Sequence, residues 1–420
     1  MSKAPKNFNP EPFAYHQEIE LTIDTLTNLG DGLGRIDGWV VMVPFTIPGE
    51  RIKARVYRNY KNYSQADLLE IIEGSMDRMK PACKIFGECG GCQYQHMTYK
   101  AQLKWKHQQV KELLLKGLGE EFEVNSVHAS PKDYNYRSKI TPHHQRPLEG
   151  KIRSIGFLHH SRRNWILDVP QCPIATEGIN EKLPAVREKA QKRAKERASD
   201  AKKSKGATLL LRDIGDRVVT DFVELVFTKV GDLEFQFKAG DFFQNNPFIL
   251  EEFTKYAVNK ASEDPDINYL VDAYCGGGLF TLFASPNFEQ CAGVEINEYA
   301  VMLANTNASA NNITNCSFRQ SSAEAIFEEV KFPQDETAVL LDPPRKGCDK
   351  EFIDQLLGFS PKRIVYVSCD PATQVRDLKP ILEAGYEILD IQPFDLFPQT
   401  RHIENVVTLE KRKDPSDKTD

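Results

Sequence analysis

Hydrophobic and polar positions alternate over short stretches in the first 75 residues of the chain. Glycine- and proline-containing turns, such as Gly30–Gly34 and Pro48–Gly49, separate these stretches, and no helical spacing of hydrophobic residues interrupts them. Closely spaced short strands of this kind are typical of a small β-barrel. The strands are expected at Glu18–Ile23, Trp39–Val43, Glu50–Val56 and Ala66–Ile72.

The middle of the chain mixes helical and strand-like patterns. An amphipathic helix is predicted from about Tyr99 to Leu118. A Lys/Arg/Ala-rich stretch between Glu181 and Lys205 also has helical character. It can contact RNA phosphates, although a solvated helix is the commoner explanation of such a stretch. Strands are expected around Ile152–Leu158, Ala207–Arg212 and Phe222–Phe227.

After about residue 263, strand-like runs alternate with helical ones. This alternation predicts a doubly wound parallel sheet. Its strands are expected at Tyr269–Ala273, Gln290–Val294, Ala338–Leu341, Arg363–Val367 and Tyr386–Pro393. We therefore predict an α/β protein of three domains, at residues 12–74, 75–234 and 235–412, followed by a disordered charged tail at 413–420.

The composition limits the class of protein. The chain has 420 residues, a net charge of −6 and nine cysteines. No apolar run is long enough to span a bilayer, and no apolar core of a signal peptide follows the first lysines. We expect a cytoplasmic monomer whose cysteines serve as thiols, metal ligands or nucleophiles. The net charge does not indicate RNA binding, but basic and aromatic residues alternate between Arg51 and Tyr63, which suits RNA contact or a solvated strand edge.

Chemically active residues follow several predicted strands in the last part of the chain. Cys369 follows an apolar run, Glu295 follows the second strand, and Asp342 precedes two prolines. The carboxyl ends of strands in open α/β sheets bind ligands, so these residues are expected at one rim. The glycine-rich loop within Asp272–Thr281 lacks the spacing of a dinucleotide or P-loop motif. Together with Glu295, which can accept hydrogen bonds from ribose hydroxyls, it favours S-adenosylmethionine as the cofactor.

A second group of residues suggests a metal site. Cys83, Cys89 and Cys92 lie on a glycine-containing stretch, and Cys172 follows in a proline-rich context. Three closely spaced thiols with a remote fourth can enclose a metal. Zinc held by four cysteines is the general expectation for such a set.

The order and content of five motifs resemble those of the RNA uracil-5 methyltransferases. The motifs are Phe243–Asn246, Asp272–Gly278, Asp342–Arg345, Ser368–Pro371 and His402–Val406. The resemblance covers nearly the whole chain, because the amino-terminal barrel resembles a TRAM domain, an OB-like RNA-binding module. It implies a Rossmann-like S-adenosylmethionine-dependent methyltransferase domain, preceded by this barrel and a central α+β iron–sulfur domain that binds RNA. Its members form 5-methyluridine in ribosomal or transfer RNA.

The resemblance also implies roles for individual residues. Cys369 would add through its sulfur to carbon 6 of a flipped-out uracil, and Glu404 would remove the proton from carbon 5. The cofactor and substrate pocket would be lined by Gln244, Tyr274, Glu295 and Asp342. The cysteine spacing resembles the branch of the family that carries a 4Fe-4S cluster, which favours iron–sulfur over zinc. The cluster ligands would be Cys83, Cys89, Cys92 and Cys172.

The substrate prediction from the resemblance is ribosomal RNA, because the barrel and the four cysteines together are common among the large-subunit enzymes of the family. Transfer RNA is the alternative. Two other hypotheses are a methyltransferase of exocyclic amines and an RNA-binding module whose methyl-transfer site has decayed. The presence of Cys369 and Glu404 argues against the first, and intact motifs argue against the second.

Overall fold

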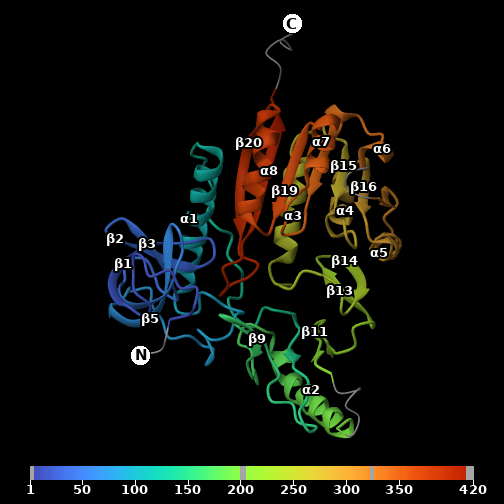
Figure 1. Ribbon diagram of the computed structural model, residues 1–420. Coiled ribbons are helices and arrows are strands. Elements are labelled where there is room, and N and C mark those ends of the chain that lie inside the picture. Colours follow the sequence, from blue (N-terminus) through green and yellow to red (C-terminus); the bar gives the residue numbers. More distant parts are fainter. Residues whose placement is uncertain (1–3, 199–204, 322–325, 413–420) are drawn as a thin grey trace.

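The computed structural model describes residues 4–198, 205–321 and 326–412. The tail predicted at 413–420 and residues 199–204 of the predicted basic stretch lie outside these ranges. Figure 1 shows three parts in chain order: a barrel in blue, a central part in green, and a sheet covered by helices in yellow to red.

The amino-terminal part is a closed five-stranded barrel with the strand order β1-β2-β3-β5-β4. Its interior holds alternating apolar side chains, among them Ile23, Val41 and Ile52, so the predicted barrel is confirmed. The strands are β1 (Glu18–Leu26), β2 (Asp31–Ile36), β3 (Trp39–Pro44), β4 (Arg51–Asn59) and β5 (Tyr63–Glu73).

The interpretation of Gly30–Gly34 as a turn was wrong for most of its length, because β2 begins at Asp31. The glycines permit close approach of other chain segments. A Cβ on Gly32 would lie 1.9 Å from Oγ1 of Thr46, and one on Gly34 would lie 2.2 Å from the carbonyl oxygen of Thr22. Glycine is therefore required inside this strand for space.

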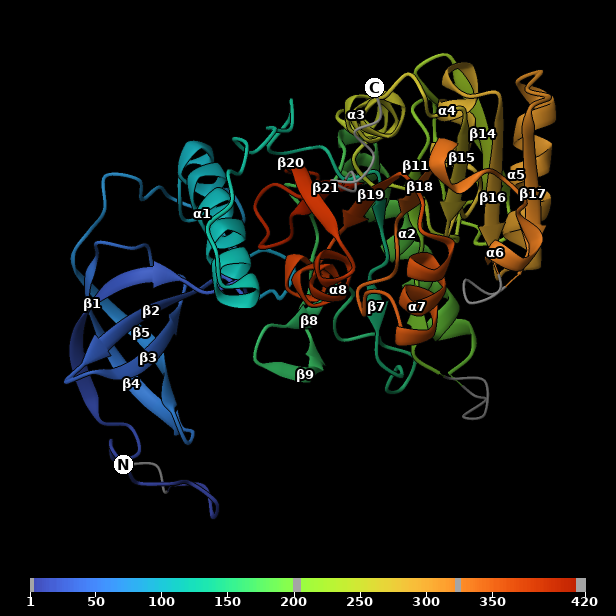
Figure 2. The same ribbon diagram turned by 90° about the horizontal axis from the view of Figure 1, so that it is seen from above.

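Helix α1 (Tyr99–Leu118) coincides with the predicted amphipathic helix. The side chain of Thr98 caps its start by accepting a hydrogen bond from the N–H of Ala101, and Gly119 ends it in the left-handed conformation. The helix lies between the barrel and the carboxyl-terminal sheet (Figures 1 and 2). Its residues Val110 and Leu114 belong to the hydrophobic core on one face of that sheet.

The central part has short strands and one long helix, α2 (Glu177–Glu196). The prediction of a strand at Ile152–Leu158 was wrong, since only Leu158 enters a strand there. Ile152 and Ile155 instead pack in a small cluster with Ala190 of α2. The strands are β6 (Lys139–Ile140), β7 (His143–His144), β8 (Leu158–His159), β9 (Arg162–Ile166), β10 (Ala207–Thr208), β11 (Leu211–Asp213), β12 (Val218–Val219), β13 (Leu225–Val230) and β14 (Leu233–Lys238).

The carboxyl-terminal part is a seven-stranded sheet with the order β17-β16-β15-β18-β19-β21-β20. Five of its strands match the predicted ones. All strands of the sheet point in the same direction except β21, which runs antiparallel to its neighbours β19 and β20. The strands are β15 (Tyr269–Ala273), β16 (Gln290–Glu295), β17 (Cys316–Gln320), β18 (Thr337–Leu341), β19 (Arg363–Ser368), β20 (Tyr386–Phe394) and β21 (Glu404–Lys411).

Helices cover both faces of this sheet, as the doubly wound prediction requires. Helices α3, α4 and α5 contribute to one core, while α7 and α8 contribute to the other together with α1. The helices are α3 (Leu250–Ser262), α4 (Leu279–Ala284), α5 (Glu298–Ala310), α6 (Ile326–Glu329), α7 (Lys350–Phe359) and α8 (Pro371–Glu383). Helix α1, which lies far earlier in the sequence, thus completes one core of the carboxyl-terminal part.

Candidate active site

The sheet register brings Cys369 and Glu404 together. Strand β19 pairs antiparallel with β21, and the last recorded pair is Ser368 with Asn405. One step further along the same register places Cys369 opposite Glu404. Cys369 follows the end of β19, and Glu404 is the first residue of β21 and only 4% exposed. The two residues predicted to act on the uracil ring therefore meet at the carboxyl end of β19.

Burial and neighbouring carboxyls favour the neutral forms of both groups. Burial raises the pKa of the Cys369 thiol to about 12, and Glu404 and Asp342 add to this shift. Burial and Asp342 also raise the pKa of Glu404 well above its ordinary value. The guanidinium of Arg345 opposes both shifts. Near neutral pH the free protein therefore holds Cys369 as a thiol, and the pKa of Glu404 is shifted toward its protonated form.

Asp342 follows strand β18, the parallel neighbour of β19, so it lies on the same rim as Cys369. Burial raises the pKa of Asp342 to about 7. Its effect on the pKa values of Cys369 and Glu404 places it within electrostatic reach of both. The structure thus groups these three predicted residues at one point.

Two basic residues complete this group, and the sequence analysis did not select them. Nη2 of Arg345 lies 3.4 Å from Nε2 of His402. Burial, together with the charges of Arg345 and Arg401, lowers the pKa of His402 to about 3, so its ring is neutral near pH 7. Both residues stand inside motifs that carried the family resemblance, which was the available signal.

A small cavity of about 80 Å³ opens beside Cys369. Its walls come from three parts of the chain: the β1–β2 turn of the barrel, helix α1, and the rim that holds Cys369. The barrel contributes Asn28 and Leu29, and α1 contributes Gln109 and Leu113. The barrel therefore forms part of the immediate surroundings of the candidate nucleophile.

The glycine-rich loop lies between β15 and α4 and faces the end of β16. The N–H of Gly276 donates to Oε2 of Glu295 at 3.2 Å. Gly276 has a positive φ of 52°, and a Cβ added there would meet no atom within 4 Å. A fixed carboxylate with spare acceptor capacity next to open space fits the ribose of a nucleoside cofactor. These residues therefore suit S-adenosylmethionine.

A buried carboxylate fixes the two ends of this loop. Oδ2 of Asp272 accepts hydrogen bonds from the backbone N–H of Thr281 at 3.0 Å and from its hydroxyl at 2.6 Å. Asp272 is fully buried, and burial raises its pKa to about 7. The sequence analysis placed this residue in the loop motif without giving it a role.

The two other predicted pocket residues have different surroundings. The ring of Tyr274 lies 5.4 Å from that of Phe352, against the core of one sheet face. Gln244 is buried in the segment between β14 and α3. Its neighbour Asn246 donates to the carbonyl oxygen of Leu396 at 3.1 Å, so this segment contacts the chain that leads to Glu404.

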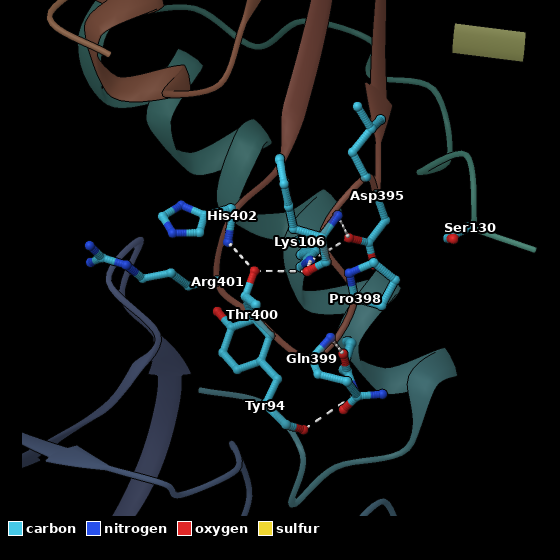
Figure 3. A network of polar contacts seen from close by, with 12 residues as sticks. Tyr94, Lys106, Ser130, Asp395, Pro398, Gln399, Thr400, Arg401 and His402 are labelled. Atoms are coloured by element: carbon cyan, nitrogen blue, oxygen red, sulfur yellow. Dashed lines mark hydrogen bonds and ion pairs between the residues drawn. The ribbon is translucent and has the colours of Figure 1, made fainter. Parts of the chain in front are cut away.

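The segment 395–403, which leads into Glu404, is held by contacts from distant parts of the chain (Figure 3). Gln399 exchanges two hydrogen bonds of 2.9 Å with the side chain of Gln102 on α1. Its carbonyl oxygen accepts from the N–H groups of Gln93 and Tyr94, both at 3.0 Å. The hydroxyl of Tyr136 donates to the carbonyl oxygen of Pro398 at 3.0 Å. Contacts from α1 and the central part thus fix the path of this segment.

A buried ion pair lies at the centre of this network (Figure 3). Nζ of Lys106 is 2.6 Å from Oδ1 of Asp395, and both side chains are fully buried. Nζ also donates to the carbonyl oxygen of Phe397 at 3.3 Å. Burial lowers the pKa of Lys106 and raises that of Asp395, while their mutual attraction opposes both shifts.

The four candidate cluster ligands share one neighbourhood but do not form a metal site. Burial raises the pKa of Cys172 to about 11, and the thiols of Cys83 and Cys89 contribute to this shift. Burial and Cys172 likewise raise the pKa of Cys92. Within residues 4–198, 205–321 and 326–412, however, no group of three or more His, Cys, Asp or Glu side chains is arranged to hold a metal ion. The geometry therefore does not support a 4Fe-4S cluster or zinc.

Similar proteins cover nearly the whole chain. The family described as tRNA (Uracil-5-)-methyltransferase matches residues 202–412, and the TRAM domain matches residues 16–69. A tRNA (uracil(54)-C(5))-methyltransferase of Schizosaccharomyces pombe is 42% identical, over 95% of this chain and 79% of that protein. The chain belongs to the tRNA (uracil-5-)-methyltransferase family.

Other relatives agree with this membership. A tRNA (uracil(54)-C(5))-methyltransferase of Saccharomyces cerevisiae is 32% identical, over 96% of this chain and 75% of that protein. An uncharacterized RNA methyltransferase of Halalkalibacterium halodurans is 32% identical, over 95% and 98% of the two chains. A tRNA (uracil-54, C5)-methyltransferase of Pyrococcus abyssi, solved with S-adenosyl-L-homocysteine, has the same fold, with a TM-score of 0.71, 24% identity and coverage of 93% and 100%.

As a family member, the chain is an RNA uracil-5 methyltransferase that uses S-adenosylmethionine. The predicted family, TRAM barrel and methyltransferase fold are confirmed, and so is S-adenosylmethionine among the two predicted cofactors. The prediction of ribosomal RNA is not supported, since the named relatives above are enzymes of transfer RNA. Among the described residues, no helix has both the length and the apolar character needed to cross a membrane.

Proposed function

We propose that the protein methylates carbon 5 of uridine 54 in transfer RNA. The support is the identity of 42% and 32% to two enzymes named for this nucleotide, each over at least 95% of the chain. This choice replaces the ribosomal substrate that the motifs alone had favoured. We also propose that residues 12–74, 75–234 and 235–412 form three domains.

The observation that supports this chemistry is the pairing of β19 with β21, whose last recorded pair, Ser368 with Asn405, lies next to Cys369 and Glu404. Carbon 5 of uracil is too electron-poor to attack a methyl group unaided. In the proposed reaction, the sulfur of Cys369 adds to carbon 6, and the electrons of the C5–C6 double bond move toward the carbonyl at carbon 4. Carbon 5 of the resulting enolate becomes the nucleophile.

S-adenosylmethionine supplies an electrophilic methyl group, and the glycine loop with Glu295 would hold it beside carbon 5. After methyl transfer, the carboxylate of Glu404 takes the proton from carbon 5. The C5–C6 double bond then forms again, and the bond between Cys369 and carbon 6 breaks. The enzyme regains its thiolate, and the product is 5-methyluridine.

The reaction needs a thiolate, whereas burial raises the pKa of Cys369 to about 12 and also raises the pKa of Glu404. Arg345 is the positive group that lowers both pKa values. We propose that it stabilises the negative charge of the Cys369 thiolate at the moment of attack. Gln244, Tyr274 and Asp342 keep their proposed role in lining the pocket.

The substrate is tested by incubating the protein and labelled S-adenosylmethionine with unmodified transcripts of transfer RNA and of large-subunit ribosomal RNA. We expect one methyl group per transfer RNA, at carbon 5 of uridine 54 by mass spectrometry, and none after replacement of that uridine by cytidine. Methylation of the ribosomal transcript alone would contradict the proposed substrate. Methyl groups on exocyclic amines would contradict the proposed chemistry.

The cluster at Cys83, Cys89, Cys92 and Cys172 stays a prediction from motif spacing, and no step of the reaction depends on it. The test is chemical analysis of protein purified without oxygen. Four iron atoms and acid-labile sulfide per chain would support the cluster. Iron-free protein with full activity would contradict it.

A further inference from the structure

Three basic side chains form a row along helix α2 and its C-cap residue, Arg197. Lys189, Arg193 and Arg197 are each four residues apart, so each step rises about 6 Å along the helix axis. All three are exposed, while Ala190 and Ala194 are buried. None of the three makes an ion pair or a side-chain hydrogen bond within the part of the chain that the structure describes.

The neighbouring basic residue on the helix shows the contrast. Both oxygens of Asp168 accept hydrogen bonds from Nη2 of Arg187, each at 2.8 Å, and Nη1 of Arg187 donates to the carbonyl oxygen of Ile155 at 2.6 Å. Arg187 is thus used to hold the central part together. The row of Lys189, Arg193 and Arg197 has no such structural role.

The row lines a cleft with a volume of about 480 Å³. Residues between Lys205 and Leu210 line it as well, and so does Phe222. The ring of Phe222 is 40% exposed, so an aromatic face is accessible beside the basic row. We call this feature the α2 cleft. One carboxylate, that of Asp221, also lines it.

This combination suits RNA. Positive side chains contact phosphates without regard to sequence, and an exposed aromatic ring can stack on a base. The chain as a whole carries a net charge of −6, so attraction to a polyanion must come from local groups such as this row. Figure 1 shows α2 at the far end of the central part, remote from strand β19, which leads to Cys369.

We propose that the α2 cleft is a second RNA-binding site, which holds the sugar–phosphate backbone of the substrate at a distance from the target uridine. The proposal rests on the proposed function, because it takes the substrate to be a folded transfer RNA. A folded RNA is large enough to contact both the rim and the cleft. A short hairpin that contains only the target loop would reach the rim alone.

The test replaces the row by alanine in the variant Lys189→Ala/Arg193→Ala/Arg197→Ala. The matched control is Lys182→Ala/Lys192→Ala/Lys195→Ala, which removes the same charge from exposed positions of α2 that do not line the cleft. Alanine favours helix, and all six side chains are exposed, so both variants are expected to fold. Matching thermal unfolding midpoints would verify this.

Binding of fluorescent full-length transfer RNA is the primary measurement, at several salt concentrations. We expect the cleft variant to bind about tenfold more weakly, with a salt dependence reduced by about two to three phosphate contacts. KM for full-length RNA should rise while kcat stays unchanged, and KM for the short hairpin should not change. The single variant Lys205→Ala, at another residue that lines the cleft, should lose about one contact.

Equal weakening by the cleft variant and the control would overturn the proposal, since general charge would then explain the effect. Unchanged affinity of the cleft variant for full-length RNA would overturn it as well. Failure of the proposed function would be visible separately, as absence of methylation by the unsubstituted protein. The binding comparison would still decide whether the α2 cleft contacts RNA.

Discussion

Asp395 and Glu404 are two buried carboxyls nine residues apart, and their surroundings differ. Asp395 has Lys106 at 2.6 Å, and the pair lies among hydrogen bonds from α1 to the segment 395–403. Glu404 has no hydrogen-bonded cation within the described residues, and Asp342 acts on it as a like charge. Arg345 opposes that effect only from a distance.

This difference separates a carboxyl that holds the chain in position from one that is proposed to act in the reaction. A buried carboxyl with a cation in direct contact is paired with it, and the pair fixes the chain around it. A buried carboxyl without such a cation has no partner that fixes its charge, and burial and Asp342 raise the pKa of Glu404. The first kind stands in the approach to the rim, and the second kind faces Cys369. The following predictions test this division, beginning with the largest effect.

Replacement of Cys369 by alanine should abolish methylation, with a loss of at least about 10⁴-fold in kcat/KM. The reason is that no other group on the rim can activate carbon 5 by addition. RNA affinity should stay nearly unchanged, as measured by fluorescence anisotropy. The control Cys316→Ala, on the outer strand β17, should retain activity. Substantial product from Cys369→Ala would remove the proposed nucleophile.

Glu404→Gln should reduce turnover by about 10²- to 10⁴-fold, because the base for carbon 5 is lost after methyl transfer. Unlike Cys369→Ala, this variant should accumulate a covalent protein–RNA complex with ordinary uridine. Denaturing gels would detect the complex. Glu387→Gln, at an exposed position of β20, serves as the control. Normal turnover without adduct in Glu404→Gln would assign the base elsewhere.

Lys106→Met should destabilise the protein by about 3–5 kcal/mol, because it leaves Asp395 buried without its cation. The double variant Lys106→Met/Asp395→Leu should recover most of that loss. Glu404→Gln, by contrast, should not lower the unfolding midpoint in urea. Lys111→Met, at an exposed site of α1, provides the matched control. Similar destabilisation by Lys106→Met and Glu404→Gln would erase the distinction between the two carboxyls.

Asp272 is a third buried carboxyl, without a contacting cation among the described residues, and its raised pKa makes the stability of the protein depend on pH. Its pKa is raised from 3.8 to about 7, so the folded state holds its proton more tightly than the unfolded state does. Stability from this group is therefore present near pH 4 and lost as the pH rises through 7. At pH 8, Asp272→Asn should unfold at a higher urea concentration than the unsubstituted protein, with a free energy of unfolding that is larger by about 2–4 kcal/mol. At pH 4 the two proteins should unfold at the same urea concentration. An equal difference at both pH values would contradict the raised pKa.

Local patterns predicted those elements whose cause lies within their own sequence. The helix at Tyr99–Leu118 has its cap and its amphipathic spacing in one stretch, and strand β15 is a single apolar run. Strand β2 was missed because Gly32 and Gly34 resemble turn residues, although their reason is contact with distant atoms. Strand β21 was missed as an element, although its first residue Glu404 was selected.

The candidate site divides in the same way. Motifs identified Cys369, Glu404 and Asp342, but the antiparallel insertion of β21 that aligns the first two depends on the whole sheet. The pair of Lys106 and Asp395 joins residues 289 positions apart, which no local pattern contains. Cysteine spacing suggested a cluster, yet spacing alone does not fix the geometry that a metal needs.

The central claim is that the sulfur of Cys369 adds to carbon 6 of the target uracil. The most direct measurement uses transfer RNA with 5-fluorouridine at position 54, because Glu404 cannot remove fluorine from carbon 5 as it removes a proton. With S-adenosylmethionine present, we predict a stable complex whose mass equals protein, RNA and one methyl group, with the cross-link on the peptide that contains Cys369. Absence of a complex, or a cross-link at another cysteine such as Cys275, would contradict the account.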